Sequence, residues 1–229
     1  MRNYKKIDDF FVEKISLVQK NNDNKYDLDN KIYKVGRVFK FKIQYTNLTK
    51  DTLVEKFLEF EIIGGTKPFS DIDSTYSQTV MKIKYLNNED KLLAFERTGI
   101  IENETNTWLH PPRSNIFHIL QLNAFPFFIK SESVKKRWSW ELECSHDIFK
   151  NIIISHKYFQ KKIISSFKGE EKYIIKSYSK SKAGLGKTIN LFNDLYGFTE
   201  MKFINYDRSF FSFKLISIKE KDGTYFFKK

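Results

Sequence analysis

The stretch KVGRVFKFKIQYTN, residues 34–47, decides the fold because its apolar and polar residues alternate. Phe39, Phe41, Ile43 and Tyr45 recur at every second position, with lysine and glutamine between them. Since successive side chains of a β-strand point to opposite faces, this period of two predicts a strand with one buried face. The run TLVEKFLEFEII, residues 52–63, is expected to be its hairpin partner.

The same alternation continues along most of the chain. Residues 79–100 indicate a strand, an Asn-Asn-Glu-Asp turn and a second strand, and residues 115–129 and 137–144 alternate in the same way. About four more strands are expected over residues 151–206, and a last one over residues 209–220. The sequence therefore predicts a mainly β protein whose roughly ten strands form a single strongly curved antiparallel sheet, a half-barrel or open barrel.

The first thirty residues differ from the rest. Apolar residues over 4–20 approach helical spacing, and residues 20–30 are polar. The expected organisation is an N-terminal helix and loop over residues 1–30, followed by a single antiparallel β domain over residues 31–229. A chain of 229 residues with 23 phenylalanines has ample apolar material for such a core.

The formal net charge is +12, and 34 of the 40 basic residues are lysine. Arginine is the planar reader of phosphates and bases, whereas lysine is mainly a solubilising point charge. Nucleic acid is therefore not favoured as a partner, and a solvated basic surface is the simpler interpretation. If the chain binds another protein, that partner is expected to be acidic.

The N-terminal residues contain no apolar run of the kind found in a secretory signal, and no stretch is apolar enough to span a membrane. A cytoplasmic location is expected for the chain as written, and the cell envelope if a signal has been removed. The single cysteine, Cys144, excludes an intramolecular disulfide.

Two sequence patterns suggest chemistry, and neither is complete. SKAGLGKT, residues 181–188, ends like a phosphate-binding loop but has serine where the first glycine should stand, so a glycine-bearing hairpin turn is the preferred interpretation. Cys144 and His146 share a strand face but lack the further ligands of a zinc site. His118 is expected to be a packed, hydrogen-bonded histidine. No nucleophile with its base is recognisable, so no metal, no cofactor and no enzymatic activity are expected.

The stretch WLHPPR, residues 108–113, has the composition of a site. Its two prolines hold the backbone extended and cannot donate to a ladder, so the stretch is expected to be an edge or a connection. One interpretation is a rigid corner that closes the open end of the curved sheet. The other is a ligand-binding lip, in which an arginine fork could hold an acidic group. The expected ligand-binding residues are aromatic and basic: Trp108, His110, Arg113, Phe125, Trp138 and Trp140.

Three motifs together resemble an uncharacterised Bacteroidota family whose members are often lipoproteins. They are TWLHPPRSNIFHILQLNAFPFF (107–128), WSWELE (138–143), and the stretch over residues 157–198 that ends in FNDLYGF. The resemblance covers about residues 107–215 and departs at Ala124, where the family has proline, and in the lack of a lipoprotein signal. It implies a half-barrel domain similar to lipoprotein-carrier proteins, and it supplies no catalytic residues.

Two binding functions follow as hypotheses. In the first, the concave face of the sheet binds an apolar ligand such as a lipid or acyl chain, which requires unfilled volume in the interior. In the second, the chain is a protein-binding module, for example a cytoplasmic immunity protein that neutralises an acidic protein partner, which requires a filled interior and a charged or aromatic outer patch.

Overall fold

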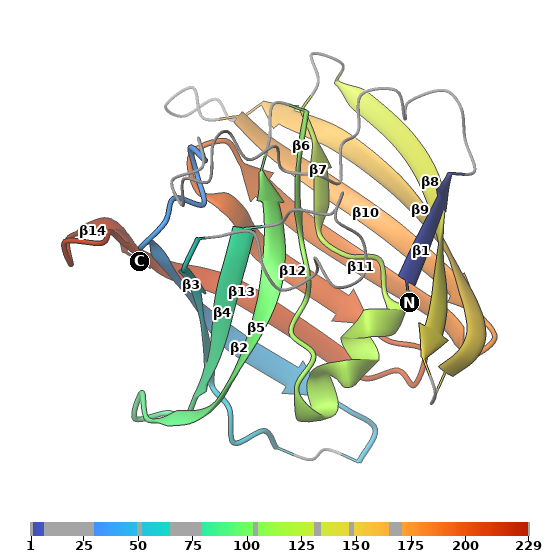
Figure 1. Cartoon of the computed structure of the whole chain (residues 1–229), viewed down its shortest axis with the longest axis horizontal. Coiled ribbons are helices and arrows are strands. Elements are labelled where there is room, and N and C mark those ends of the chain that lie inside the picture. Colours follow the sequence, from blue (N-terminus) through green and yellow to red (C-terminus); the bar gives the residue numbers. More distant parts are fainter. Residues whose placement is uncertain are drawn as a thin grey trace.

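The computed structural model describes residues 2–6, 30–49, 52–64, 79–102, 105–130, 134–146, 149–164 and 171–228. Within these residues, fourteen strands form one antiparallel sheet (Figure 1). The order across the sheet is β1-β8-β9-β10-β11-β12-β13-β2-β3-β4-β5-β6-β7, and β14 pairs with β13. The strands are β1 (Arg2–Lys6), β2 (Val38–Thr46), β3 (Phe57–Ile62), β4 (Thr79–Leu86), β5 (Leu92–Glu102), β6 (Asn106–Leu109), β7 (Phe127–Ile129), β8 (Lys135–His146), β9 (Phe149–Ile164), β10 (Glu171–Ser181), β11 (Gly184–Asn193), β12 (Gly197–Ile204), β13 (Phe210–Lys219) and β14 (Tyr225–Lys228).

The predicted fold class is confirmed: the protein is mainly β, and its sheet curves without closing into a barrel. The predicted hairpins β2–β3 and β4–β5 are both present. Register shifts interrupt the ladders in β8, β11, β13 and β4, and such bulges bend a strand and increase its twist. The bends let the walls curl towards each other, so that β3–β5 lie across the interior from β10–β12 (Figure 1).

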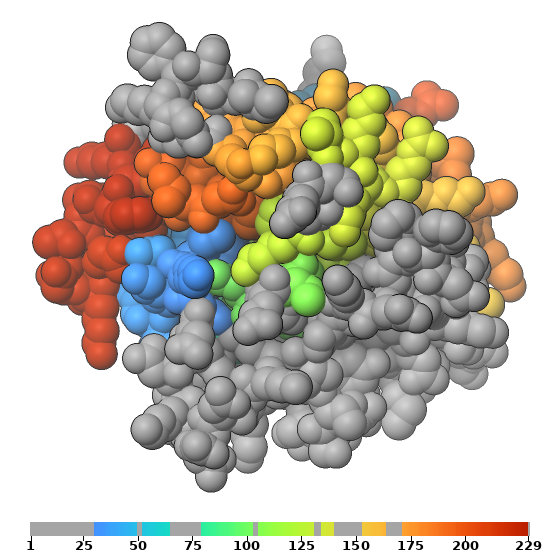
Figure 2. Space-filling view, turned by 90° about the horizontal axis from the view of Figure 1, so that it is seen from above, coloured from blue at the N-terminus to red at the C-terminus, as the bar shows by residue number. Residues whose placement is uncertain are grey.

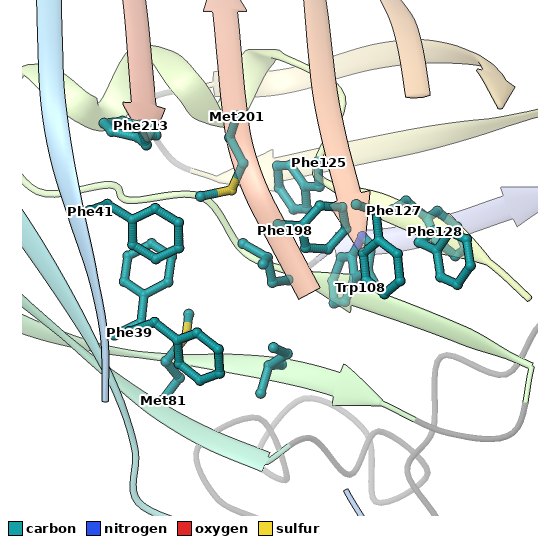
Figure 3. Packing of buried hydrophobic residues seen from close by; sticks show 14 of the residues in the cluster. Phe39, Phe41, Met81, Trp108, Phe125, Phe127, Phe128, Phe198, Met201 and Phe213 are labelled. Carbon is teal, nitrogen blue, oxygen red and sulfur yellow. The ribbon is translucent and has the colours of Figure 1, made fainter. Parts of the chain in front are cut away.

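The interior between these walls is filled by aromatic side chains. Phe128 of β7 stacks on Phe192 of β11 with ring centroids 3.9 Å apart, so β7 packs directly against the wall that contains β11. Phe39, Phe41, Trp108, Phe198 and Met201 project into the same space (Figure 3). Alternation explains this core, because every inward position of β2 and β13 over their central residues is apolar.

Residues 105–130, called here the inner arm, lie over the concave face. They comprise β6, the 3-10 helix η2 (Asn115–Leu122) and β7. The strand predicted over residues 115–129 is wrong for its first half, because η2 occupies it. Phe117 and Leu120 are buried, and their spacing of three residues fits one face of a 3-10 helix. His118 is therefore exposed, and the prediction of a packed histidine is wrong.

The N-terminal helix predicted over residues 4–20 lies mostly outside the described residues. Its first three residues belong to β1, which pairs with β8. The predicted domain boundary after residue 30 stays a prediction, because residues 7–29 are outside the described part.

Residues 30–37 connect two distant parts of the sheet. The Glu102 carboxylate accepts backbone N–H bonds from Lys31, Ile32 and Tyr33, at 2.8–3.3 Å. The Arg37 guanidinium forms an ion pair with Glu220 after β13. Figure 2 shows the resulting arrangement, with the blue residues that follow Asn30 beside the red C-terminal strands. No helix in the described residues is long and apolar enough to cross a membrane.

Candidate functional site

The WLHPPR corner begins inside the protein. Trp108, His110 and Phe125 are at most 2% exposed, and their rings form one cluster with centroids 4.5–5.6 Å apart. The backbone N–H of His110 donates to the carbonyl of Gly99 at 3.3 Å. These three predicted site residues are thus brought together as part of the packed inner arm.

Arg113 leaves this cluster and faces outwards. Its guanidinium donates to the carbonyl of Arg97 at 2.8 Å and lies 3.5 Å from the Glu96 carboxylate. Glu96 also accepts bonds from the backbone N–H of Arg113, the hydroxyl of Ser114 and the hydroxyl of Tyr85. Burial raises the pKa of the Tyr85 hydroxyl well above its usual value, and the adjacent Glu96 charge adds to the effect. Glu96 therefore anchors the corner after its two prolines.

The structure describes the side chain of one of the two tryptophans of β8, Trp138, and only the backbone of the other, Trp140. Trp138 is 4% exposed and stacks face to face on Tyr158 of β9, with ring centroids 4.9 Å apart. Its ring also meets the edge of Phe127 from the inner arm. The backbone of Trp140 pairs with His156 in β9, and its side chain lies outside the described residues. Trp138 is thus part of the surface on which the inner arm packs.

Amide side chains hold the inner arm in place, and the sequence did not reveal them. Gln160 of β9 donates to the carbonyl of Ile129 at 2.7 Å and accepts its N–H at 3.0 Å, so its amide pairs with β7 as a neighbouring strand would. Asn123 donates to Asn205, which in turn donates to Ser209. The alternation of β9, which places Gln160 on the same face as Tyr158, is the one sequence signal that could have found it.

Two suggestive patterns have structural roles or fall outside the description. SKAGLGKT forms the tight turn between β10 and β11, with Lys187 and Thr188 already inside β11, so the hairpin interpretation is confirmed. The side chains of Cys144 and His146 are outside the described residues. Among the residues that are described, no three His, Cys, Asp or Glu side chains gather in a way that could hold a metal ion.

The outer face of β9–β11 carries a regular array of cations. It is called here the lysine face, and consists of Lys157, Lys161, Lys176, Lys180 and Lys187. Lys157 is paired across the ladder with Tyr178, which is paired with Lys187, so the three side chains form one row. Lys176 and Lys180 lie on either side of this row along β10. Strands about 4.8 Å apart thus bring these charges close together.

The lysine face differs from the other half of the outer surface in how its charge is balanced. On β2–β5, Lys40 pairs with Asp90 and Lys84 pairs with Glu61, while Lys42 and Lys82 have no carboxylate partner among the described residues. None of the five lysines of the lysine face has a carboxylate within ion-pair distance among the described residues. The single described outward carboxylate on β9–β12, Glu200, is paired with Lys202 at 2.9 Å. Positive charge is therefore uncompensated on one side of the sheet.

Apolar side chains are exposed among these lysines. Tyr178 is 52% exposed and lies under the ammonium of Lys187 at 5.8 Å, and Ile163 and Ile204 are also exposed. Arg137 of β8 extends the cationic surface and lies over Phe159. The net charge of the sequence predicted a basic surface, but only strand register places lysine and aromatic residues side by side.

The chain matches no protein-family model and no curated protein sequence. Among solved structures it is similar to an inferred lipoprotein from Parabacteroides distasonis, with 8% identity and a TM-score of 0.44 over 80% of this chain and 96% of that one. It is also similar to an inferred exported protein with a YmcC-like fold from Bacteroides fragilis, with 9% identity and a TM-score of 0.35 over 82% of this chain and 97% of that one.

Proposed function

We propose that the protein is a non-enzymatic binding protein whose lysine face docks an acidic surface of another protein. The observation that carries the proposal is the uncompensated charge of these five lysines, which lie together on neighbouring strands without a carboxylate between them. Positive and negative patches that meet across an interface accelerate encounter and suppress wrong partners. The partner would supply the carboxylates that this side of the sheet lacks.

The exposed apolar groups favour a protein over a nucleic acid as this partner. Protein interfaces combine an apolar, aromatic centre with a polar rim. Tyr178 would lie at such a centre between Lys157 and Lys187, and Ile204 extends the same row beyond Lys187. Nucleic-acid readout relies instead on arginine forks, and none of the five charged positions is arginine.

The filled interior gives less support to an apolar ligand on the concave face. Trp108, Phe125 and Trp138, which were expected to line such a site, are packed against one another or against the walls. An open hollow of about 220 Å³ lies at the end of β2, lined by Ile43, Tyr45 and Leu53 among others. Pockets that enclose small molecules usually measure about 300–1,000 Å³, so this hollow is too small for an acyl chain.

Fluorescence anisotropy with a labelled peptide rich in glutamate and leucine tests the proposal. Binding is expected at low salt and should weaken as salt shortens the screening length to about 10 Å at 0.1 M. The triple variant Lys157→Glu, Lys176→Glu, Lys180→Glu should lose it. The matched control reverses three exposed lysines elsewhere, Lys34, Lys91 and Lys219, and reaches the same net charge.

The outcomes separate the classes of partner. Loss in the first triple variant and retention in the control support docking at the lysine face. Equal loss in both variants would show a general charge effect and refute the proposal. Tighter binding to a single-stranded oligonucleotide of equal charge, or to vesicles of anionic phospholipid, would also refute it.

A further inference from the structure

Three polar side chains lie together on the concave wall, beneath the inner arm. The inward residues of β11 are, in order, Gly186, Thr188, Asn190 and Phe192. Ser177 of β10 is paired directly with Thr188. Ser177, Thr188 and Asn190 are each 0% exposed. Apolar residues lie beside them, because Ile175 and Met201 flank Asn190 on the neighbouring strands.

The inner arm crosses the concave wall beside this polar group. A Cβ on Gly186 would lie 2.1 Å from Oδ1 of Asn123, so the arm touches β11 there. Two residues further along the arm, the carbonyl of Phe125 accepts from the hydroxyl of Tyr158 on β9 at 3.3 Å. Tyr158 is paired directly with Ser177, which is paired with Thr188. The arm is therefore held to the wall on both sides of the polar group.

Four polar atoms in this group have no protein partner. They are the hydroxyl oxygens of Ser177 and Thr188, and both Oδ1 and Nδ2 of Asn190. Nearby inward polar groups are partnered: Gln160 bonds to Ile129, and Nδ1 of His156 lies 2.9 Å from the hydroxyl of Ser179. Because buried polar groups almost always have hydrogen-bond partners, these four atoms require one from outside the chain.

The chemistry of the four atoms defines what they would bind. Hydroxyl groups donate and accept, and an amide offers two donors and an acceptor, so a partner must do both. The inward imidazole of His156, on β9, is held neutral because burial lowers its pKa to about 3. We propose that Ser177, Thr188 and Asn190 form a buried site for ordered water, whose hydroxyl groups both donate to and accept from these four atoms.

A high-resolution crystal structure from protein purified and frozen without glycerol or sugar tests the site. Density within hydrogen-bond distance of Asn190 and Thr188 is expected. Separate peaks would confirm water, and continuous density from a larger molecule would overturn the proposal. A site without density would overturn the proposal.

The variant Thr188→Val gives a second, independent measurement. Valine keeps the shape and removes the hydroxyl, so a bound hydroxyl group would lose a partner and the melting temperature should fall by about 2–4 °C. An unchanged or higher melting temperature would overturn the proposal, since removal of an unsatisfied hydroxyl stabilises a core. Thr199→Val is the matched control, because the Thr199 hydroxyl already donates to the carbonyl of Leu191 at 3.4 Å.

Discussion

Replacement of Gln160 by leucine should destabilise the protein by disconnecting the inner arm. Residue 129 is the last of β7, and its N–H and C=O point away from β6, since the adjacent Lys130 N–H bonds to Thr105. Gln160 satisfies both groups, at 3.0 Å and 2.7 Å. Leucine has a similar shape and satisfies neither, and Ile129 is only 5% exposed, so water cannot replace the amide freely.

The magnitude follows from the two groups left without partners. Each buried polar group without a hydrogen bond costs about 1–3 kcal/mol, so the free energy of unfolding should fall by roughly 2–6 kcal/mol. For a chain of this size, each kcal/mol corresponds to about 2–4 °C, which gives a melting temperature lower by roughly 4–24 °C. Circular dichroism during thermal and urea unfolding measures both quantities.

Two further variants make the result specific. Gln44→Leu, on an exposed position of β2, should change stability by less than about 0.5 kcal/mol. Gln160→Glu should be impaired at neutral pH, because a carboxylate cannot donate to the carbonyl of Ile129, and should recover when it is protonated. Its folded-state pKa would be raised, so its stability relative to the wild type should rise as pH falls towards about 4. Gln160 would not be the group that holds β7 if Gln160→Leu lowered the free energy of unfolding by less than about 1 kcal/mol and left the Ile129 amide protected from hydrogen exchange.

Three other changes probe the same interior. Burial lowers the pKa of His156 to about 3, so the folded state binds fewer protons than the unfolded state, and stability should fall from pH 6.5 downwards by about 2 kcal/mol at pH 5. Urea midpoints at pH 7 and pH 5 should show this fall in the wild type and in the exposed control His118→Gln, and a smaller fall in His156→Gln. Gly186→Ala places a Cβ 2.1 Å from Oδ1 of Asn123 and should lower the free energy of unfolding by about 1–3 kcal/mol. Adding Asn123→Ala removes the clashing oxygen and should restore part of that stability. A double variant no more stable than Gly186→Ala would argue against the clash. Glu102→Ala removes the acceptor of three backbone N–H groups and should lower the melting temperature by several degrees, whereas an unchanged value would mean that residues 31–33 contribute little to stability.

The alternation of apolar and polar residues predicted most strands of the sheet. The prediction was wrong where the spacing of buried residues is three instead of two. The strands from β2 to β5 and from β9 to β13 follow the pattern of two because each has one face in the core and one in solvent. In the segment after Ser114, apolar and polar residues alternate in the sequence, yet the segment forms η2. Its buried residues Phe117 and Leu120 are three apart, which is the spacing of a 3-10 helix. The short strands β1, β6, β7 and β14 carry too few residues for their period to be recognised.

The candidate sites were less accessible to sequence reasoning. The two prolines of WLHPPR predicted a conformationally restricted corner. Its composition did not predict that Trp108 and His110 pack inwards while Arg113 contacts Glu96 at the surface. The excess of lysine predicted a basic surface. It could not place the lysine face, because that face depends on residues of three strands being in register.

The sequence by itself thus determined the fold class, the antiparallel pairing of neighbouring strands and the overall positive charge, because these depend on local period and composition. Tertiary structure alone decided that the inner arm packs on the concave face, that Gln160 completes the edge of β7, and that Ser177, Thr188 and Asn190 are buried together on the concave wall. Such features join residues far apart in the chain, and their energies depend on which groups lose water together.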